Sequence, residues 1–199
     1  RVQAEPDLIG DFAGLEYYIT TKMDGSSHSV SLDEDGFHVT GHNYEYKDDG
    51  KSAFYELVKR EDIEKKVRKY YEKNELHLLT IQGELCAPGI QQNRLKLIRP
   101  EWYEFTIRLD GKRVGLRKMQ EICENLSLQM VPVEEVEMDL PSKYPTVEAL
   151  LQRADGEYPK GGKKEGIVIR PTEPVFCERI GASLSMKVVS NKFLLKIAE

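Results

Sequence analysis

The sequence predicts an α+β fold in which antiparallel sheets are flanked by helices. Short segments rich in β-branched and aromatic residues recur along the chain, and stretches of helical spacing lie among them. Tight-turn residues separate several neighbouring segments, which favours hairpins and antiparallel sheets over a doubly wound parallel sheet. At 199 residues, a single domain (1–199) is the expected organisation, with two lobes around a cleft as the variant.

The expected strands follow from composition and from the turns between them. LEYYITT at 15–21 is rich in strand-forming residues, and HSVSL and FHVTG flank an acidic turn as the two arms of a hairpin. EWYEFTIRL ends at Asp110-Gly111, a common turn pair. The full set of expected strands is 15–21, 28–32, 37–41, 75–85, 101–109, 131–136, 166–169 and 184–189.

The expected helices follow from a period near 3.6 residues and from capping signals. Residues 52–72 carry apolar side chains at helical spacing and are expected to form one helix. Thr146 is a favourable N-cap and Glu148 follows it in the first turn. The expected helices are 52–72, 116–126, 146–153 and a segment from residue 191 onward.

Composition narrows the class of protein. A net charge of −5 argues against indiscriminate coating of nucleic acid, although it leaves room for a local basic groove. The three cysteines form no C-x-x-C pair, which fits reduced thiols in an intracellular protein, cytoplasmic or organellar. No apolar run approaches the roughly 18 residues needed to cross a bilayer, and no secretory signal is present. Because the chain begins at Arg1 rather than Met, we expect a fragment of a longer protein.

Four short segments, each beside an expected strand, carry the chemistry. They are K-M-D-G at Lys22, Q-G-E-L at Gln82, E-G-I-V-I-R at Glu165 and S-M-K-V-V at Ser185. Each is unremarkable alone, and K-M-D-G by itself reads as a strand that ends in a turn. Their combination and order indicate a specific site.

A lysine attacks phosphorus only as the neutral amine. The pKa of an ordinary lysine is about 10.4, so roughly one amine in a thousand is neutral near pH 7.4. Nearby cations or a bound metal ion must therefore favour the free amine. Lys187 and a divalent ion would also stabilise charge on a polyphosphate. Asp24, Glu84 and Glu165 offer the oxygen ligands that Mg²⁺ or Mn²⁺ prefers.

These segments resemble the motifs of the covalent nucleotidyltransferases, which comprise polynucleotide ligases and mRNA capping enzymes. The resembling residues are Lys22-Met23-Asp24-Gly25 (motif I), Gly83-Glu84-Leu85 (III), Tyr103-Glu104-Phe105 (IIIa), 165–170 (IV) and Met186-Lys187-Val188 (V). The longer forms GELCAPGIQQN and KVVSNKFLLK are similar to ATP-dependent RNA ligases that seal nicks with 3′-hydroxyl and 5′-phosphate ends. The resemblance runs from near Arg1 to about Lys196.

The resemblance implies an ATP-grasp-like ligase nucleotidyltransferase fold around a nucleotide cleft. It also implies an RNA ligase that forms a lysyl-AMP, transfers AMP to a 5′-phosphate end, and lets a 3′-hydroxyl displace AMP. ATP and Mg²⁺ or Mn²⁺ are the implied cofactors. RNA or an RNA-containing nicked duplex is the implied partner, in a monomeric enzyme of RNA repair. The resemblance further implies an appended OB-fold domain, so we expect residues 1–199 to be a fragment without it.

The resemblance also implies roles for single residues. Lys22 would be the nucleophile, and Lys187 would contact phosphate. Glu84 would contact the ribose or the waters of the metal, and Asp24 and Glu165 would position that metal. The remaining nucleotide-binding candidates are Arg1, Met23, Gly25, Ser27, Asn93 and Phe105.

Phe105 has a structural alternative. It is expected to stack on adenine, but an aromatic residue in a strand also suits a core. Strand alternation predicts Tyr103 and Phe105 on one face and Trp102 on the other.

Two positions depart from the family pattern. Motif V is often K-x-K, but Ser185 and Val189 stand two residues from Lys187. Relatives commonly carry an arginine after motif I, where this chain has Gly41-His42-Asn43, and neutral imidazole is a poorer phosphate clamp than guanidinium.

Two alternatives remain open. One is the equivalent domain of a DNA ligase or a capping guanylyltransferase, disfavoured because the chain ends soon after motif V. The other is a catalytically silent nucleic-acid-binding module, disfavoured because binding alone needs no nucleophile.

Overall fold

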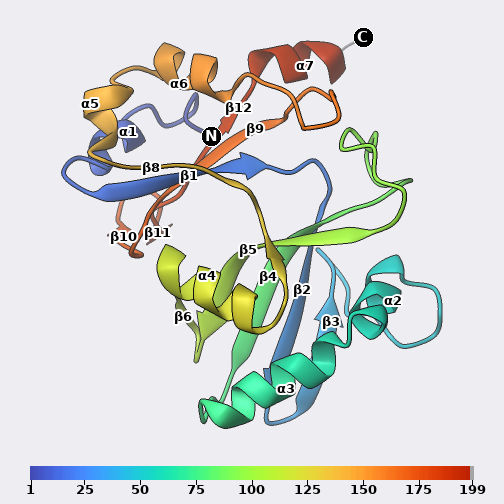
Figure 1. The fold of residues 1–199 in the computed structure, drawn as a ribbon. Helices are drawn as coiled ribbons and strands as arrows, with labels where there is room; N and C mark the ends of the chain where they lie inside the picture. The colour runs from blue at the N-terminus through green and yellow to red at the C-terminus, as the bar shows by residue number, and fades with distance from the viewer. Residues whose placement is uncertain (198–199) are drawn as a thin grey trace. The chain divides into compact units, whose positions relative to one another are not determined.

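The computed structural model describes residues 1–197, so positions 198–199 of the expected domain lie outside it (Figure 1). The chain divides into two compact units. Unit 1 combines Arg1–Asp24 with Val131–Glu199, and unit 2 comprises Gly25–Met130. Both units mix helices with largely antiparallel sheets, as the sequence predicts.

Unit 1 is built on a four-stranded antiparallel sheet with the order β12-β9-β1-β8. Its strands are β1 (Glu16–Lys22), β8 (Val133–Met138), β9 (Gly166–Pro171) and β12 (Met186–Val189), and a small hairpin joins β10 (Phe176–Cys177) to β11 (Ala182–Ser183). Its helices are α1 (Leu8–Asp11), α5 (Leu140–Lys143), α6 (Val147–Ala154) and α7 (Asn191–Ile197). Thr146 caps α6 as predicted, since its hydroxyl accepts a hydrogen bond from the Ala149 amide.

The core of unit 1 lies on one face of this sheet. Tyr17 and Ile19 of β1 and Ile167 and Ile169 of β9 are fully buried there. Residues of α1, α5 and α6 pack into the same cluster. Because strand side chains alternate, the intervening residues of β1, β9 and β12 lie on the opposite face.

Unit 2 is built on a sheet with the order β3-β2-β4-β5-β6, and β7 pairs with β5 in parallel. The strands are β2 (Ser26–Asp33), β3 (Gly36–Thr40), β4 (Leu79–Cys86), β5 (Glu101–Leu109), β6 (Lys112–Arg113) and β7 (Gln129–Met130). The helices are α2 (Ala53–Arg60), α3 (Ile63–Lys73) and α4 (Leu116–Asn125). Helix α3 contacts β2, and α4 contacts β5.

The helix expected at 52–72 is two helices. Asp62 adopts a left-handed conformation (φ 53°) between α2 and α3, which interrupts the helical backbone. The predicted apolar positions are nevertheless buried in both helices, including Phe54, Leu57 and Val67.

The strand expected from residue 75 begins later, at Leu79. The Asp110 carboxylate accepts hydrogen bonds from the amides of His77 (2.7 Å) and Leu78 (2.9 Å), so these residues form a turn instead of extending β4. Several short elements carry too little periodicity to be predicted, namely α1, α5, β6, β7, β10 and β11. No helix among the described residues is long and apolar enough to span a membrane.

Candidate active site

Lys22 and Glu165 meet at the end of two neighbouring strands in unit 1. Lys22 is the last residue of β1 and pairs with Gly166, the first residue of β9. Glu165 directly precedes β9, and its Oε1 lies 2.8 Å from the Nζ atom of Lys22. Both side chains are largely buried, with about a fifth of their surface exposed. The antiparallel register therefore brings the lysine of one motif to the acid of another.

Tyr158 holds the main chain of both residues, and it was not among the residues singled out from the sequence. Its hydroxyl donates to the carbonyl oxygen of Lys22 (2.7 Å) and accepts from the amide of Glu165 (3.3 Å). The main-chain carbonyl oxygen of Glu165 accepts a further hydrogen bond from the Ser190 amide (2.8 Å). Tyr158 belongs to no recognisable motif, and its position beside the glycine-rich segment 160–166 is the one signal that could have found it.

Lys187 lies on the same sheet face as Lys22. Lys187 pairs with Val168, which in turn pairs with Thr20, two residues before Lys22. These residues therefore lie opposite the buried core face. Lys187 is exposed, whereas Val188 beside it is fully buried.

Arg1 borders this strand through its neighbour in sequence. The amide of Val2 donates to the carbonyl oxygen of Lys187 (3.0 Å), and Val2 is fully buried in the unit 1 core. The Arg1 side chain itself is exposed. The N-terminal segment is thus anchored beside β12.

The residues after Lys22 are tightly packed. Met23 and Asp24 are buried, and Gly25 begins unit 2. A Cβ atom on Gly25 would lie 2.2 Å from the carbonyl oxygen of Leu85, so a side chain there would force the two backbones apart. The contact that requires a glycine here is with the strand of motif III, and nucleotide binding by Gly25 stays a prediction.

Glu84 and Ser27 are paired on neighbouring strands of unit 2. They lie opposite one another in the β2–β4 register, and Glu84 also pairs with Tyr103 of β5. The side-chain amide of Gln82 donates to the Ser27 hydroxyl (2.9 Å). Trp102 lies on the opposite face, as predicted, where it packs edge-on against Phe54 of α2 with ring centroids 5.1 Å apart.

Phe105 lies at a β-bulge. Gly83 pairs with Glu104 and Gln82 pairs with Thr106, so Phe105 is the extra residue of β5. Strict alternation therefore does not decide its face. Bulges of this kind often redirect a side chain beside an active site, and Phe105 is partly exposed.

Asn93 shapes its own loop. Its side-chain amide donates to the Leu97 carbonyl oxygen (2.9 Å), and its side-chain oxygen accepts from the Leu97 amide (3.0 Å). Asn93 also adopts a left-handed conformation (φ 45°). The side chain thus stabilises the loop of the segment GELCAPGIQQN.

The predicted metal ligands divide between the units. Asp24 and Glu165 belong to unit 1 and Glu84 to unit 2. Within residues 1–197, no group of three or more acidic, histidine or cysteine side chains is arranged to hold a metal ion by itself.

Burial lowers the pKa of His28, whose ring nitrogens contact Ser26 and the Tyr46 hydroxyl. That histidine therefore serves the structure of unit 2.

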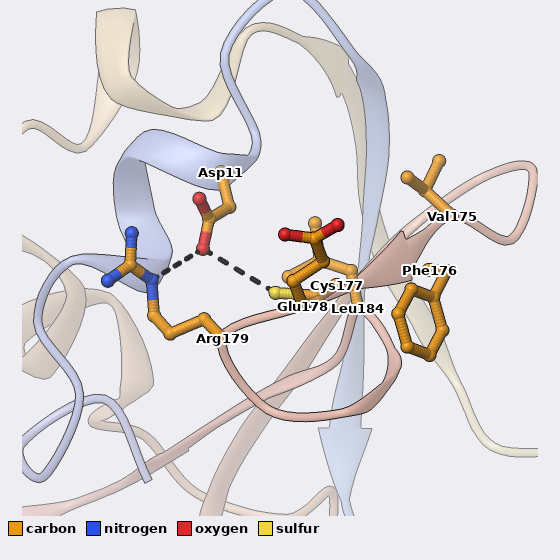
Figure 2. A pocket seen from close by; sticks show the side chains of 7 residues that line it. All are labelled: Asp11, Val175, Phe176, Cys177, Glu178, Arg179 and Leu184. Atoms are coloured by element: carbon orange, nitrogen blue, oxygen red, sulfur yellow. Dashed lines mark hydrogen bonds and ion pairs between the residues drawn. The ribbon is translucent and has the colours of Figure 1, made fainter.

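A cavity of about 420 Å³ in unit 1 lies away from these motifs, at the β10–β11 hairpin (Figure 2). The Asp11 carboxylate is held there by Arg179 (2.9 Å) and by the Cys177 thiol (3.6 Å). Phe176 points away from this group and is largely exposed. None of the residues that line the cavity belongs to the motif set.

The family is decided by comparison of the whole sequence. The family profile described as RNA ligase matches residues 15–189, from the residue before β1 to the end of β12. The chain belongs to the RNA ligase family. Its motif residues therefore lie in the segment that the family shares.

Solved RNA ligases of Naegleria gruberi share the fold of this RNA ligase chain. A point mutant solved with ATP and Mn is 25% identical, with a TM-score of 0.84 over 98% of this chain. The form solved with pyrophosphate is 25% identical, with a TM-score of 0.81. A second mutant, solved with AMP and Mn, is 24% identical, with a TM-score of 0.82. The chain spans only about 55% of the length of these proteins. No curated protein matches the sequence significantly.

Proposed function

We propose that this chain is the nucleotidyltransferase part of an ATP-dependent RNA ligase. The observation that carries the proposal is the 2.8 Å contact between Nζ of Lys22 and the carboxylate of Glu165. A lysine and an acid from two distant motifs meet there, within a segment that the RNA ligase profile matches. An ATP-grasp-like fold around a nucleotide cleft is part of the same proposal.

The proposed reaction begins at the lysine. Lys22 loses a proton, and its neutral amine attacks the α-phosphorus of ATP. A nitrogen–phosphorus bond forms, the bond from that phosphorus to the bridging oxygen breaks, and pyrophosphate leaves. The oxygen of a 5′-phosphate end then displaces the lysine and takes the AMP. Finally, a 3′-hydroxyl attacks that end phosphate, releases AMP and closes the strand.

The other motif residues would bind and orient the nucleotide. We propose that Lys187 contacts phosphate, where its charge stabilises the negative charge that develops during transfer. Phe105 would stack on adenine, and Glu84 would contact the ribose. The secondary contacts would come from Arg1, Met23, Gly25, Ser27 and Asn93.

A hydrated divalent cation fits the donor set. Asp24, Glu84 and Glu165 are carboxylates, and Mg²⁺ and Mn²⁺ prefer oxygen ligands. Mg²⁺ usually keeps several waters and binds through one or two carboxylates together with substrate phosphates, so a complete protein cage is not required. When bound, the ion would neutralise charge on the phosphates. The Naegleria structures that contain ATP or AMP also contain Mn.

The direct test is covalent labelling of the protein. Purified chain is incubated with Mn²⁺ or Mg²⁺ and α-labelled ATP, α-labelled GTP or adenylate-labelled NAD, then resolved on a denaturing gel. We expect label from ATP in the wild type and none in Lys22→Ala. Lys59→Ala, which removes a surface lysine paired with Asp48, is the matched control and should label normally.

Other labelling patterns would replace the proposal. Label from GTP alone would indicate a capping enzyme, and label from NAD would indicate a bacterial-type DNA ligase. Absence of label with correctly folded protein would indicate a silent binding module. Sealing of nicked duplexes with RNA or DNA at the 3′-hydroxyl side then identifies the preferred strand.

A further inference from the structure

We propose that Tyr158 is a positioning residue that sets the distance between the amine of Lys22 and the carboxylate of Glu165. This inference deepens the proposed function and rests on it. The hydroxyl of Tyr158 bonds the main chain of both members of the pair. It acts through the two main chains from which they project.

The strand ladder alone does not hold Glu165. The β1–β9 ladder ends at the pair Lys22 and Gly166, so Glu165 lies one residue beyond the last pair. The Tyr158 hydroxyl bridges this gap, because it bonds the carbonyl oxygen of Lys22 at 2.7 Å and the amide of Glu165 at 3.3 Å. The hydroxyl oxygen of Tyr158 thus links Lys22, the last residue of β1, to Glu165, the residue before β9.

Tyr158 is itself fixed by a closed turn. Its amide donates to the carbonyl oxygen of Gly162 (2.7 Å), and its carbonyl oxygen accepts from the Gly161 amide (2.8 Å). The main chains of Glu157 and Lys163 form an antiparallel β-bridge that closes the base of this turn. The Tyr158 side chain is 3% exposed, so its ring has little freedom to move.

This arrangement should affect the reaction more than it affects nucleotide binding. The reacting amine must lie in a near-attack geometry, and a misplacement of about 1 Å can lower a rate by roughly 100-fold. Tyr158 is buried and is bonded to main-chain atoms, so its hydroxyl is not available to ATP. Removal of the hydroxyl should therefore lower the rate of adenylylation and leave the KM for ATP unchanged.

The test compares Tyr158→Phe with Tyr144→Phe in single-turnover adenylylation by ATP. Tyr144 is also a buried tyrosine of unit 1, and its hydroxyl donates to Glu135 (2.9 Å), a residue outside the motif set. We expect Tyr158→Phe to lower the rate constant by about tenfold, with an unchanged final amount of lysyl-AMP per chain and an unchanged KM. Tyr144→Phe should keep the wild-type rate constant.

Three outcomes would overturn the proposal. The first is a wild-type rate constant in Tyr158→Phe. The second is a lower final amount of lysyl-AMP with a normal rate constant, which would show only loss of folded protein. The third is an equal fall in Tyr144→Phe, which would show a general effect of losing a buried hydroxyl.

A second readout needs no nucleotide and separates this proposal from the proposed function. An amine-acylating reagent is applied to the folded proteins, and modification of Lys22 is followed by mass spectrometry. Loosening of the ion pair in Tyr158→Phe should raise the Lys22 modification rate about two- to fivefold, the range that loss of a partly exposed ion pair allows. If the wild type takes no label from ATP, the proposed function fails, and this comparison alone decides the role of Tyr158. An unchanged modification rate would then reject it.

Discussion

At the scale of single residues, the site is organised around an amine whose neighbour is an acid. Lys22 and Glu165 are 2.8 Å apart and only about a fifth exposed. A lysine attacks phosphorus only as the neutral amine, so a proton must leave this nitrogen before the proposed attack.

Phe105 is the residue whose role can be tested most simply by substitution. If it stacks on adenine, Phe105→Leu should weaken ATP binding by about tenfold, because base stacking on an aromatic ring contributes roughly 1–3 kcal/mol. Phe105→Tyr keeps the ring and should bind ATP nearly as the wild type does. Calorimetric titration with ATP in the Lys22→Ala background measures both affinities without turnover.

The alternative for Phe105 predicts the reverse pattern. If Phe105 serves packing, Phe105→Leu should bind ATP normally but unfold at a lower temperature. Because Phe105 is partly exposed at a bulge, we expect the unfolding temperature of Phe105→Leu to differ little from that of the wild type.

At the scale of elements, β5 combines a functional candidate with a buried acid. Glu104 is fully buried on the helix side of the sheet, and within the described residues neither of its carboxyl oxygens has a hydrogen-bond partner. Burial raises the pKa of Glu104 well above its ordinary value, and the carboxylate of Glu61 adds to this shift. Burial also raises the pKa of the Cys123 thiol on α4 to about 12, and Glu104 contributes. A neutral acid is the form that such an environment favours.

This raised pKa predicts how the stability of unit 2 depends on pH. Below about pH 4.3, Glu104 is protonated in both the folded and the unfolded state, so its titration has no effect on stability. At higher pH the unfolded chain ionises first, and the free energy of unfolding falls until the pH passes the folded-state pKa. Glu104→Gln removes this loss, so its advantage over the wild type should grow with pH by up to about 1.4 kcal/mol per unit.

Urea unfolding between pH 4 and 8 measures this difference. Trp102, the one tryptophan of the chain, lies two residues from Glu104 in β5, so its fluorescence reports on unit 2. Glu121→Gln removes an exposed carboxylate of α4 and should follow the wild type at every pH. Parallel curves for the wild type and Glu104→Gln would show that Glu104 does not titrate differently on folding.

At the scale of the whole molecule, the candidate site residues divide between two compact units. Lys22, Glu165 and Lys187 belong to unit 1, whereas Glu84 and Phe105 belong to unit 2. Unit 1 is assembled from both ends of the chain, and unit 2 is one continuous segment. Ligand binding should therefore be measured on the entire chain.

Nucleotide binding should stabilise the folded chain. In Lys22→Ala, which cannot form the covalent adduct, ATP with Mn²⁺ at 100 times the dissociation constant should add about 2.7 kcal/mol to the free energy of unfolding. A chelator should reduce this gain, and GTP should give less than ATP at the same concentration. Thermal unfolding with each nucleotide, with and without metal, measures this stabilisation. Equal stabilisation by GTP, or no effect of the chelator, would argue against an ATP and metal site.

Much of the fold could be predicted from the sequence because its signals are local. Strand β5 begins and ends where the composition of EWYEFTIRL and the turn at Asp110-Gly111 predict, and the hairpin of β2 and β3 follows its acidic turn. The break at Asp62 and the bulge at Phe105 could not be predicted, because each depends on how one backbone meets its neighbours.

The candidate site likewise contains residues that the sequence predicts and one that it does not. The motif residues were found because they carry reactive groups in a recognisable order. Tyr158 was missed because its contribution comes from hydrogen bonds to main-chain atoms, one of them in Lys22, 136 residues away in the sequence. A periodicity or a motif contains no information on such contacts.

Unit 1 is formed by two separate segments of the chain, and this affects how the protein folds during synthesis. As the chain leaves the ribosome, Lys22 emerges before unit 2, and unit 2 is complete before Glu165, β9 and β12 are translated. The first strand must wait for its partners, so no truncated translation product that ends before β9 can pair the amine with its acid. A chain that stops before β9 therefore lacks the lysine–acid pair on which the proposed adenylylation depends.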